Sequence, residues 1–367
     1  MKPIRCTAIR TVTLMLFIYC PLVFVSDTAA AEKEAQSVFG KTIERSIRLL
    51  RGEKVTPGNE DWKKVCKRYE NVSFPAADKP KAEDAATLDK CESYDLYYGF
   101  DKAADPVQAR LCAYHEMESM KGRDAFSGID MLMMIYANGV GAKRNLPLAI
   151  KLACKIEGAP AEMEERIAHL EQLKKQNWQG TDFSLCDDIT SSYMQAICAD
   201  HFESFAKINR KKKLMLIQAK WTAAEKADYA LLRKAAERFF DYMTENEVDQ
   251  SGLARNAVTT EEQGALEEEF MVILQGLNDG KRLSYSVDQF KAADSELNSV
   301  YRKIQKAEDE VLWGTITKKG IKETQREWIR YRDAWVSFCR KKYPRVETHG
   351  IKTVLTLIRT DQLKLFL

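Results

Sequence analysis

The chain has 367 residues, a formal net charge of +3 at pH 7, and few prolines and glycines (9 and 17). A charge so close to neutral gives no indication of a nucleic-acid partner, because such proteins gather an excess of Lys and Arg. The scarcity of proline and glycine, with Ala, Glu, Lys and Leu plentiful, favours helices. We therefore expect an all-α protein.

Residues 1–31 have the three parts of a secretory signal peptide. Lys2, Arg5 and Arg10 precede an apolar run over 11–25, and three alanines end the segment. The run is shorter than the roughly 20 apolar residues that a transmembrane helix needs. We expect cleavage after residue 31, a periplasmic or secreted location at a bacterial cell envelope, and no stable membrane anchor in the mature chain.

Residues 91–156 contain a pattern that recurs after 40 residues. The matching positions are Gly99 and Gly139, Asp105 and Asn145, and Ala109 and Ala149. In each copy the residues predict a helix, a turn with glycine, a capping Asp or Asn and a second helix. Helix pairs at such a period are typical of stacked repeats, which bury together what one pair cannot bury alone.

The segment 131–145, followed by Ala149, resembles a Sel-like repeat, which is related to the tetratricopeptide repeat. Residues 91–118 match the same pattern in part. The resemblance implies helical hairpins that bind other proteins. We place them in an N-terminal helical domain over 32–180.

The rest of the chain predicts a helical hairpin with a polar connector over 181–282, and a three-helix domain over 283–367. In the last segment apolar residues recur at helical spacing in three stretches. The second stretch ends near Pro344, since the residue before a proline disfavours the helical conformation. Three such helices form a small bundle.

Three motifs of this bundle, at 293–301, 325–335 and 355–363, resemble the LprI-type lysozyme-inhibitor domain in that order. The resemblance implies a secreted, helical and often cysteine-bridged domain whose named activity is lysozyme inhibition. The motif residues are Asp294, Leu297, Asn298, Tyr301, Gln325, Trp328, Tyr331, Arg332, Asp333, Thr356 and Arg359.

We expect these motif residues to be mainly structural. Their aromatic side chains are suited to anchor a bundle core. Arg332 or Arg359 is expected to pair with Asp333 between the second and third helices. Asn298 and Gln325 are expected to form hydrogen bonds across the bundle.

Nine cysteines are present, of which seven remain outside the predicted signal peptide. An odd number leaves at least one thiol, and export makes disulfides plausible. We expect Cys186–Cys198, which resembles the paired cysteines at the start of LprI-type domains, and Cys91–Cys112. The connectivity of Cys66, Cys154 and Cys339 stays open, with Cys66–Cys154 as one pairing and Cys339 as the candidate odd thiol.

Neither catalysis nor cofactor binding is indicated. The sequence lacks the serine nucleophile elbow, the phosphate-binding glycine loop and the His-Glu-x-x-His zinc motif, and its four histidines are scattered. We therefore expect no enzyme activity, no metal site and no cofactor.

Two functions are expected from these patterns. The first is a periplasmic inhibitor that binds and blocks a cell-wall lytic enzyme such as lysozyme. For it, the acidic residues of the polar connector are a candidate surface for a basic partner: Glu261, Glu262, Glu267, Glu268 and Glu269. The alternative is a non-catalytic envelope scaffold that binds a partner protein through the helical repeats.

Overall fold

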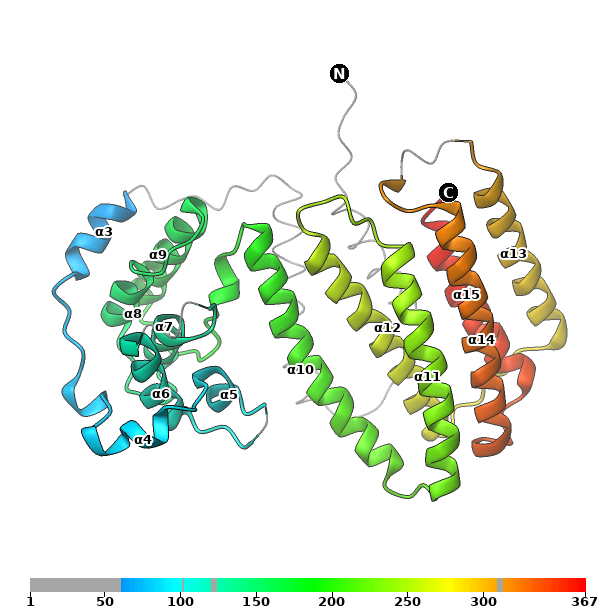
Figure 1. Cartoon of the computed structure of the whole chain (residues 1–367), viewed down its shortest axis with the longest axis horizontal. Coiled ribbons are helices and arrows are strands. Elements are labelled where there is room, and N and C mark those ends of the chain that lie inside the picture. Colours follow the sequence, from blue (N-terminus) through cyan, green and yellow to red (C-terminus); the bar gives the residue numbers. More distant parts are fainter. Residues whose placement is uncertain (1–60, 101, 120–123, 309–312) are drawn as a thin grey trace. The chain divides into compact units, whose positions relative to one another are not determined.

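Figure 1 shows the computed structural model, which describes residues 61–367 except 101, 120–123 and 309–312. The predicted signal peptide, together with residues 32–60, lies outside the described residues. Every regular element that the structure describes is a helix, and no strand occurs in these ranges. The all-α prediction is confirmed.

The chain divides into two compact units between Ser204 and Phe205, inside helix α10 (Ser192–Gln218). We call residues 61–204 the N-terminal unit and residues 205–367 the C-terminal unit. The N-terminal unit also contains α3 (Trp62–Tyr69), α4 (Ala85–Leu88), α5 (Ser93–Tyr98), α6 (Pro106–Ser119), α7 (Gly128–Asn138), α8 (Leu146–Ala153) and α9 (Pro160–Lys175). The C-terminal unit continues with α11 (Ala223–Asn246), α12 (Arg255–Asn278), α13 (Val287–Lys306), α14 (Lys318–Lys342) and α15 (Thr348–Lys364).

This division differs from the expected boundaries after residues 180 and 282. Residues 181–204 lie with the N-terminal unit because Phe183, Leu185 and the cysteine pair Cys186–Cys198 pack into its core. The rest of the segment expected to be a helical hairpin and polar connector contributes α11 and α12 to the core of the C-terminal unit. The expected hairpin and connector therefore belong to two different cores.

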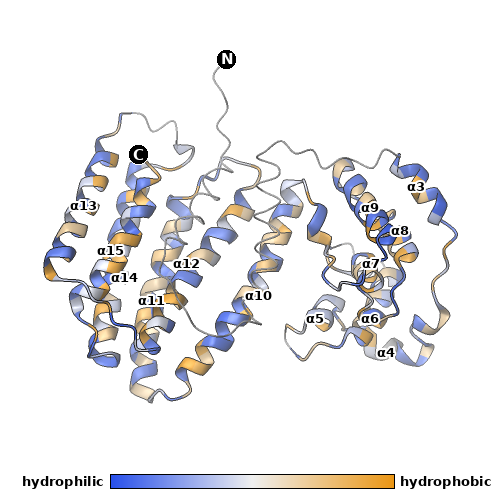
Figure 2. Cartoon of the chain, turned by 180° about the vertical axis from the view of Figure 1, so that it is seen from behind, coloured by the Kyte–Doolittle hydropathy of each residue, from blue (hydrophilic) through white to orange (hydrophobic). Residues whose placement is uncertain are grey.

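The N-terminal unit is built around α7, whose residues Met131–Ala137 are all fully buried. Seven consecutive apolar residues leave this helix no wet face, so it must be covered on every side. Helices α5, α6 and α8 pack against it. Figure 2 shows how apolar and polar residues alternate along the other helices.

The same hydrogen bonds recur 40 residues apart in the helix pairs α5–α6 and α7–α8. Gly99 and Gly139 end the first helix of each pair in the left-handed conformation, with φ of 73° and 67°. The amide of Asp105 donates to Leu96 O at 2.8 Å, and that of Asn145 donates to Tyr136 O at 2.9 Å. This geometry agrees with the period read from the sequence.

Three disulfides join Cys66 to Cys154, Cys91 to Cys112 and Cys186 to Cys198, with Cα–Cα distances of 5.7, 5.9 and 5.8 Å. All three lie within the N-terminal unit. The pairs coincide with those considered from the sequence. Cys339 is a free, buried cysteine of the C-terminal unit.

The C-terminal unit is a helical bundle in which α11 packs along α14, and α13 packs along α15. Capping boxes fix the starts of α11 and α13, where Thr222 and Ser286 exchange hydrogen bonds with Glu225 and Gln289. Apolar side chains from all five helices meet in one core.

Gly141 gives a test of the turn in the second helix pair. Its φ is +86°, and a Cβ there would lie 2.2 Å from Pro106 O, whereas Gly280 has φ +80° and open space around it. We expect Gly280→Ala to cost about 1 kcal/mol of unfolding free energy from backbone strain alone. Gly141→Ala should cost about 3 kcal/mol, since a steric clash adds to the strain. Urea unfolding of each unit measures both, and equal losses would contradict the close approach to Pro106.

Candidate functional site

Most aromatic motif residues of the C-terminal unit form its core. Trp328, Tyr331 and Trp335 on α14 are 2, 1 and 0% exposed. Tyr331 stacks on Phe239 of α11 at a centroid distance of 5.1 Å, and Trp335 contacts Phe270 of α12 at 5.0 Å. These anchors therefore pack against helices that lie outside the motif segment.

Two smaller motif residues share this core, and one lies at its edge. Leu297 on α13 and Thr356 on α15 are 3 and 0% exposed. Tyr301 on α13 is only partly buried and packs against the core from its edge. The packing role expected for these residues is consistent with their positions.

Arg359 on α15 is the centre of a buried polar cluster. Its guanidinium is fully buried and donates two hydrogen bonds to the carboxylate of Glu247, with N–O distances of 2.9 and 2.6 Å. Its Nε donates to Gln325 Oε1 at 2.9 Å, and Nη1 donates to Gln362 Oε1 at 3.3 Å. The cluster thereby joins α15 to α14 and to Glu247, the residue that caps the end of α11.

The expected pairing of Arg359 with Asp333 is wrong. Asp333 lies on the exposed face of α14, whereas Arg359 is fully buried, so the two side chains cannot meet. Arg332 does contact Asp333, at 3.2 Å, but as its neighbour on the same helix. The true partner of Arg359 is Glu247, which follows a helix outside the motifs and gives no sequence signal of pairing.

The two expected amide hydrogen bonds behave differently. Gln325 does bridge two helices, since its side-chain oxygen accepts from Arg359. Asn298 does not: its Nδ2 donates to the backbone oxygen of Asp294 at 2.7 Å and to its carboxylate at 3.0 Å, one turn earlier on α13. For Asn298 the expectation of a bond across the bundle is wrong.

The acidic residues expected in a polar connector lie on α12 and are mostly engaged within the unit. Glu267 receives two hydrogen bonds from Arg233 on α11, one of them at 2.6 Å. Glu268 lies 3.5 Å from the ammonium group of Lys213. Glu261 is the exposed member of the set. These residues belong to a helix of the bundle and not to a connector, and their role as a partner-binding surface stays a prediction.

Glu262 and Glu269, about two turns apart on α12, have strongly raised pKa values. Burial, and then the charges of Glu247 and Glu261, raise the pKa of Glu262 to about 7. Burial and the charge of Glu262 raise the pKa of Glu269 to about 8, against the lowering effect of Arg359. The polar cluster thus contains more carboxyl groups than its single guanidinium can compensate.

A second group of motif residues lies at the surface where α13 meets α14, and we call it the surface motif cluster: Asp294, Asn298, Arg332 and Asp333. The guanidinium of Arg332 stacks over the ring of Trp328, at 5.1 Å from its centroid, and reaches Asp294 at 3.9 Å. Asn298 is exposed, and the side chain of Asp333 is 58% exposed. These four residues combine two carboxylates, an amide and a guanidinium on one face.

Cys339 on α14 carries the one free thiol of the described residues. It is 1% exposed, and burial raises its pKa to about 12. A thiol in this state is neutral at physiological pH and inaccessible, so it is not a nucleophile. It fills core volume.

Neither a metal-ligating cluster nor a membrane-spanning helix is found in the part of the chain that the structure describes. No group of three or more His, Cys, Asp or Glu side chains there is arranged to hold a metal ion. No described helix has the length and apolar character to cross a bilayer.

Residues 279–363 match the family model of the lysozyme inhibitor LprI. The match confirms the resemblance seen in the three motifs, and it covers α13, α14 and nearly all of α15. No curated protein and no solved structure matches the chain. Residues 279–363 are therefore similar to the LprI family, while the Sel-like resemblance of 91–156 stays a prediction.

The buried ion pair is tested by Arg359→Met. The substitution leaves Glu247 buried without a partner, so we expect it to lower the unfolding free energy of the C-terminal unit by about 3–5 kcal/mol. The double variant Glu247→Met/Arg359→Met should recover part of that loss, because no lone charge then remains. Urea unfolding followed by circular dichroism measures both.

Arg345→Met is the matched control, since Arg345 is exposed. It should change the unfolding free energy by less than about 0.5 kcal/mol. A loss in Arg359→Met no larger than in this control would show that the pair does not stabilise the fold.

The raised pKa values predict an unusual pH dependence. Both Glu262 and Glu269 bind a proton more tightly in the folded chain than in the unfolded chain, where the ordinary pKa is 4.5. The folded chain holds more protons between about pH 4.5 and pH 8, so its stability falls as the pH rises through this window. As the pH rises through this window, the urea midpoint of unfolding should fall less in the Glu262→Gln/Glu269→Gln variant than in the unsubstituted chain. Glu245→Gln, at an exposed position of α11, should retain the full fall.

Proposed function

We propose that this protein binds and blocks a lysozyme-type enzyme of the cell wall, and that its C-terminal unit performs the inhibition. The match of residues 279–363 to the lysozyme inhibitor LprI family carries this proposal. The three disulfides support a periplasmic or secreted location, since such bonds persist in oxidising compartments. In this role the protein is a binding partner and not an enzyme.

The surface motif cluster is the contact surface that we propose. A motif residue inside the bundle is needed for packing, but Asn298 and Asp333 are exposed and contribute little to the core. Asp294 and Asp333 offer two carboxylates to the basic surface that lysozymes commonly have. Charges at the rim of an interface steer the encounter and make it depend on salt.

The proposal is tested with purified residues 32–367 in a turbidity assay of lysozyme on bacterial cell walls. We expect lysis to slow at equimolar inhibitor. Asp294→Ala/Asn298→Ala/Asp333→Ala should weaken inhibition at least about tenfold, which corresponds to about 1.4 kcal/mol of binding free energy. The fold should stay intact, because none of the three side chains is buried.

Asp288→Ala is the matched control, since Asp288 lies on α13 and its side chain is 92% exposed. It should inhibit like the unsubstituted chain. Undiminished lysis at a several-fold molar excess, with lysozymes of several types, would refute the inhibitor function. Inhibition that the triple variant retains would refute only the proposed surface.

A second candidate function is a scaffold that binds an envelope protein through the helix pairs of the N-terminal unit. The hydrogen bonds that recur 40 residues apart in α5–α6 and α7–α8 favour it. The two candidates differ in which unit binds: a scaffold would lose its partner through substitutions in the N-terminal unit while the triple variant of the C-terminal unit retained it.

A further inference from the structure

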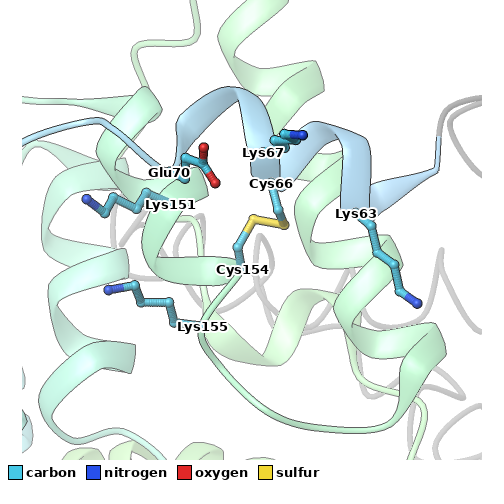
Figure 3. A pocket seen from close by; sticks show the side chains of 7 residues that line it. All are labelled: Lys63, Cys66, Lys67, Glu70, Lys151, Cys154 and Lys155. Atoms are coloured by element: carbon cyan, nitrogen blue, oxygen red, sulfur yellow. A yellow bond between two sulfur atoms is a disulfide. The ribbon is translucent and has the colours of Figure 1, made fainter.

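A lysine-lined pocket surrounds one of the three disulfides of the N-terminal unit. Figure 3 shows the bond between Cys66 of α3 and Cys154 at the end of α8, with lysine side chains on both sides of it. The pocket has a volume of about 400 Å³. It is lined by Lys63, Cys66, Lys67, Glu70, Lys151, Cys154 and Lys155.

The ammonium groups of this pocket are not neutralised by carboxylates. None of the four lysines forms an ion pair in the described part of the chain, and Lys151 donates instead to the backbone oxygen of Val72 at 2.5 Å. Glu70 is the one acidic residue of the lining. In residues 61–204 as a whole, Asp and Glu outnumber Lys and Arg, so the pocket is a positive site within an acidic unit.

The other two disulfides have the opposite surroundings. Cys112 is fully buried, and its sulfur lies 3.5 Å from the carboxylate of Glu116. Cys186 and Cys198 are 8 and 2% exposed, and two aspartates follow Cys186 directly in the sequence. Cys66 and Cys154 are both partly exposed. Cys91 is also partly exposed, but its partner Cys112 is buried beside Glu116. Cys66–Cys154 is therefore the one pair of the three in which both cysteines are partly exposed and lysines line the surroundings.

We propose that Cys66–Cys154 is a thiol–disulfide exchange site for small anionic thiols. A thiolate carrying a further acidic group attacks one sulfur, forming a mixed disulfide and releasing the other cysteine as a thiolate. A second thiol of the same kind then attacks the mixed disulfide. The products are one oxidised thiol dimer and two reduced cysteines, and the electrons come from the two thiols.

The lysines favour both steps of this reaction. Their charges attract the anionic thiol to the pocket, and they stabilise the cysteine thiolate that leaves. A carboxylate beside the sulfur, as at Cys112, repels an approaching anionic thiol. Exchange is therefore expected at one bond of the three while the other two stay oxidised.

Reduction would remove the covalent link between α3 and α8 without opening the core of the unit. Tyr69 of α3 still donates to Glu171 of α9 at 2.5 Å, and Arg68 lies 3.7 Å from the same carboxylate. These contacts keep α3 attached by noncovalent interactions. The chain should remain folded when this bond alone is reduced, which makes its exchange rate measurable in the native protein.

The test compares thiols of different charge on the full chain without its predicted signal peptide. Mercaptoethanesulfonate is anionic, 2-mercaptoethanol neutral and cysteamine cationic. Alkylation at timed intervals, followed by peptide mapping, gives the rate at which each disulfide opens. Each rate is divided by the concentration of the thiolate form of the added thiol. We expect Cys66–Cys154 to open first, and its rate with the anionic thiol to exceed that with the cationic thiol by at least about fivefold, the effect of one close charge pair in water.

Lys63→Gln/Lys67→Gln/Lys155→Gln should reduce this charge preference to near unity and leave the rate with 2-mercaptoethanol less affected. Lys64→Gln/Lys143→Gln/Lys175→Gln removes three exposed lysines outside the lining and should retain the preference. Circular dichroism checks that both variants are folded. Equal rates at the three disulfides, no preference for the anionic thiol, or equal effects of the two triple variants would each overturn the proposal.

Discussion

The ion pair between Arg359 and Glu247 is the constraint on which the C-terminal unit depends. A guanidinium with no solvent exposure is tolerated only when its hydrogen bonds are satisfied, and Glu247, Gln325 and Gln362 satisfy them. Arg359 lies inside the LprI match and Glu247 outside it. The family segment therefore needs α11 to complete its own interior, and the folding unit is larger than the sequence match.

The aromatic core leads to the same conclusion. Tyr331 and Trp335 belong to the motifs, but their ring partners Phe239 and Phe270 lie on α11 and α12. What the family segment supplies alone is the outer surface of α13 and α14, where Asn298 and Asp333 meet solvent. The motif residues thus fall into a group that packs in the core and a group at the surface, and the proposed inhibitor surface is the second group, in which Arg332 also stacks on Trp328.

Local patterns in the sequence predicted the helices well, because helical periodicity, capping residues and turn glycines act within a few residues. Gly99 and Gly139, read from a 40-residue period, both end helices in the left-handed conformation. Side-chain partners that lie far apart in the sequence were harder to predict. The glutamates of α12 read as a solvated connector, yet Arg233 of the preceding helix pairs with Glu267. Nothing near Glu247 indicates the arginine 112 residues later that it binds.

We expect that the segment matched by the LprI model does not form a complete fold without the helices before it. Urea unfolding of residues 205–367 and of residues 279–367, followed by circular dichroism, tests it most directly. We expect a cooperative transition for 205–367 and a broad, non-cooperative loss of helix for 279–367, in which Arg359 lacks the carboxylate of Glu247 at the end of α11. A cooperative transition of 279–367 at a similar urea midpoint would contradict it.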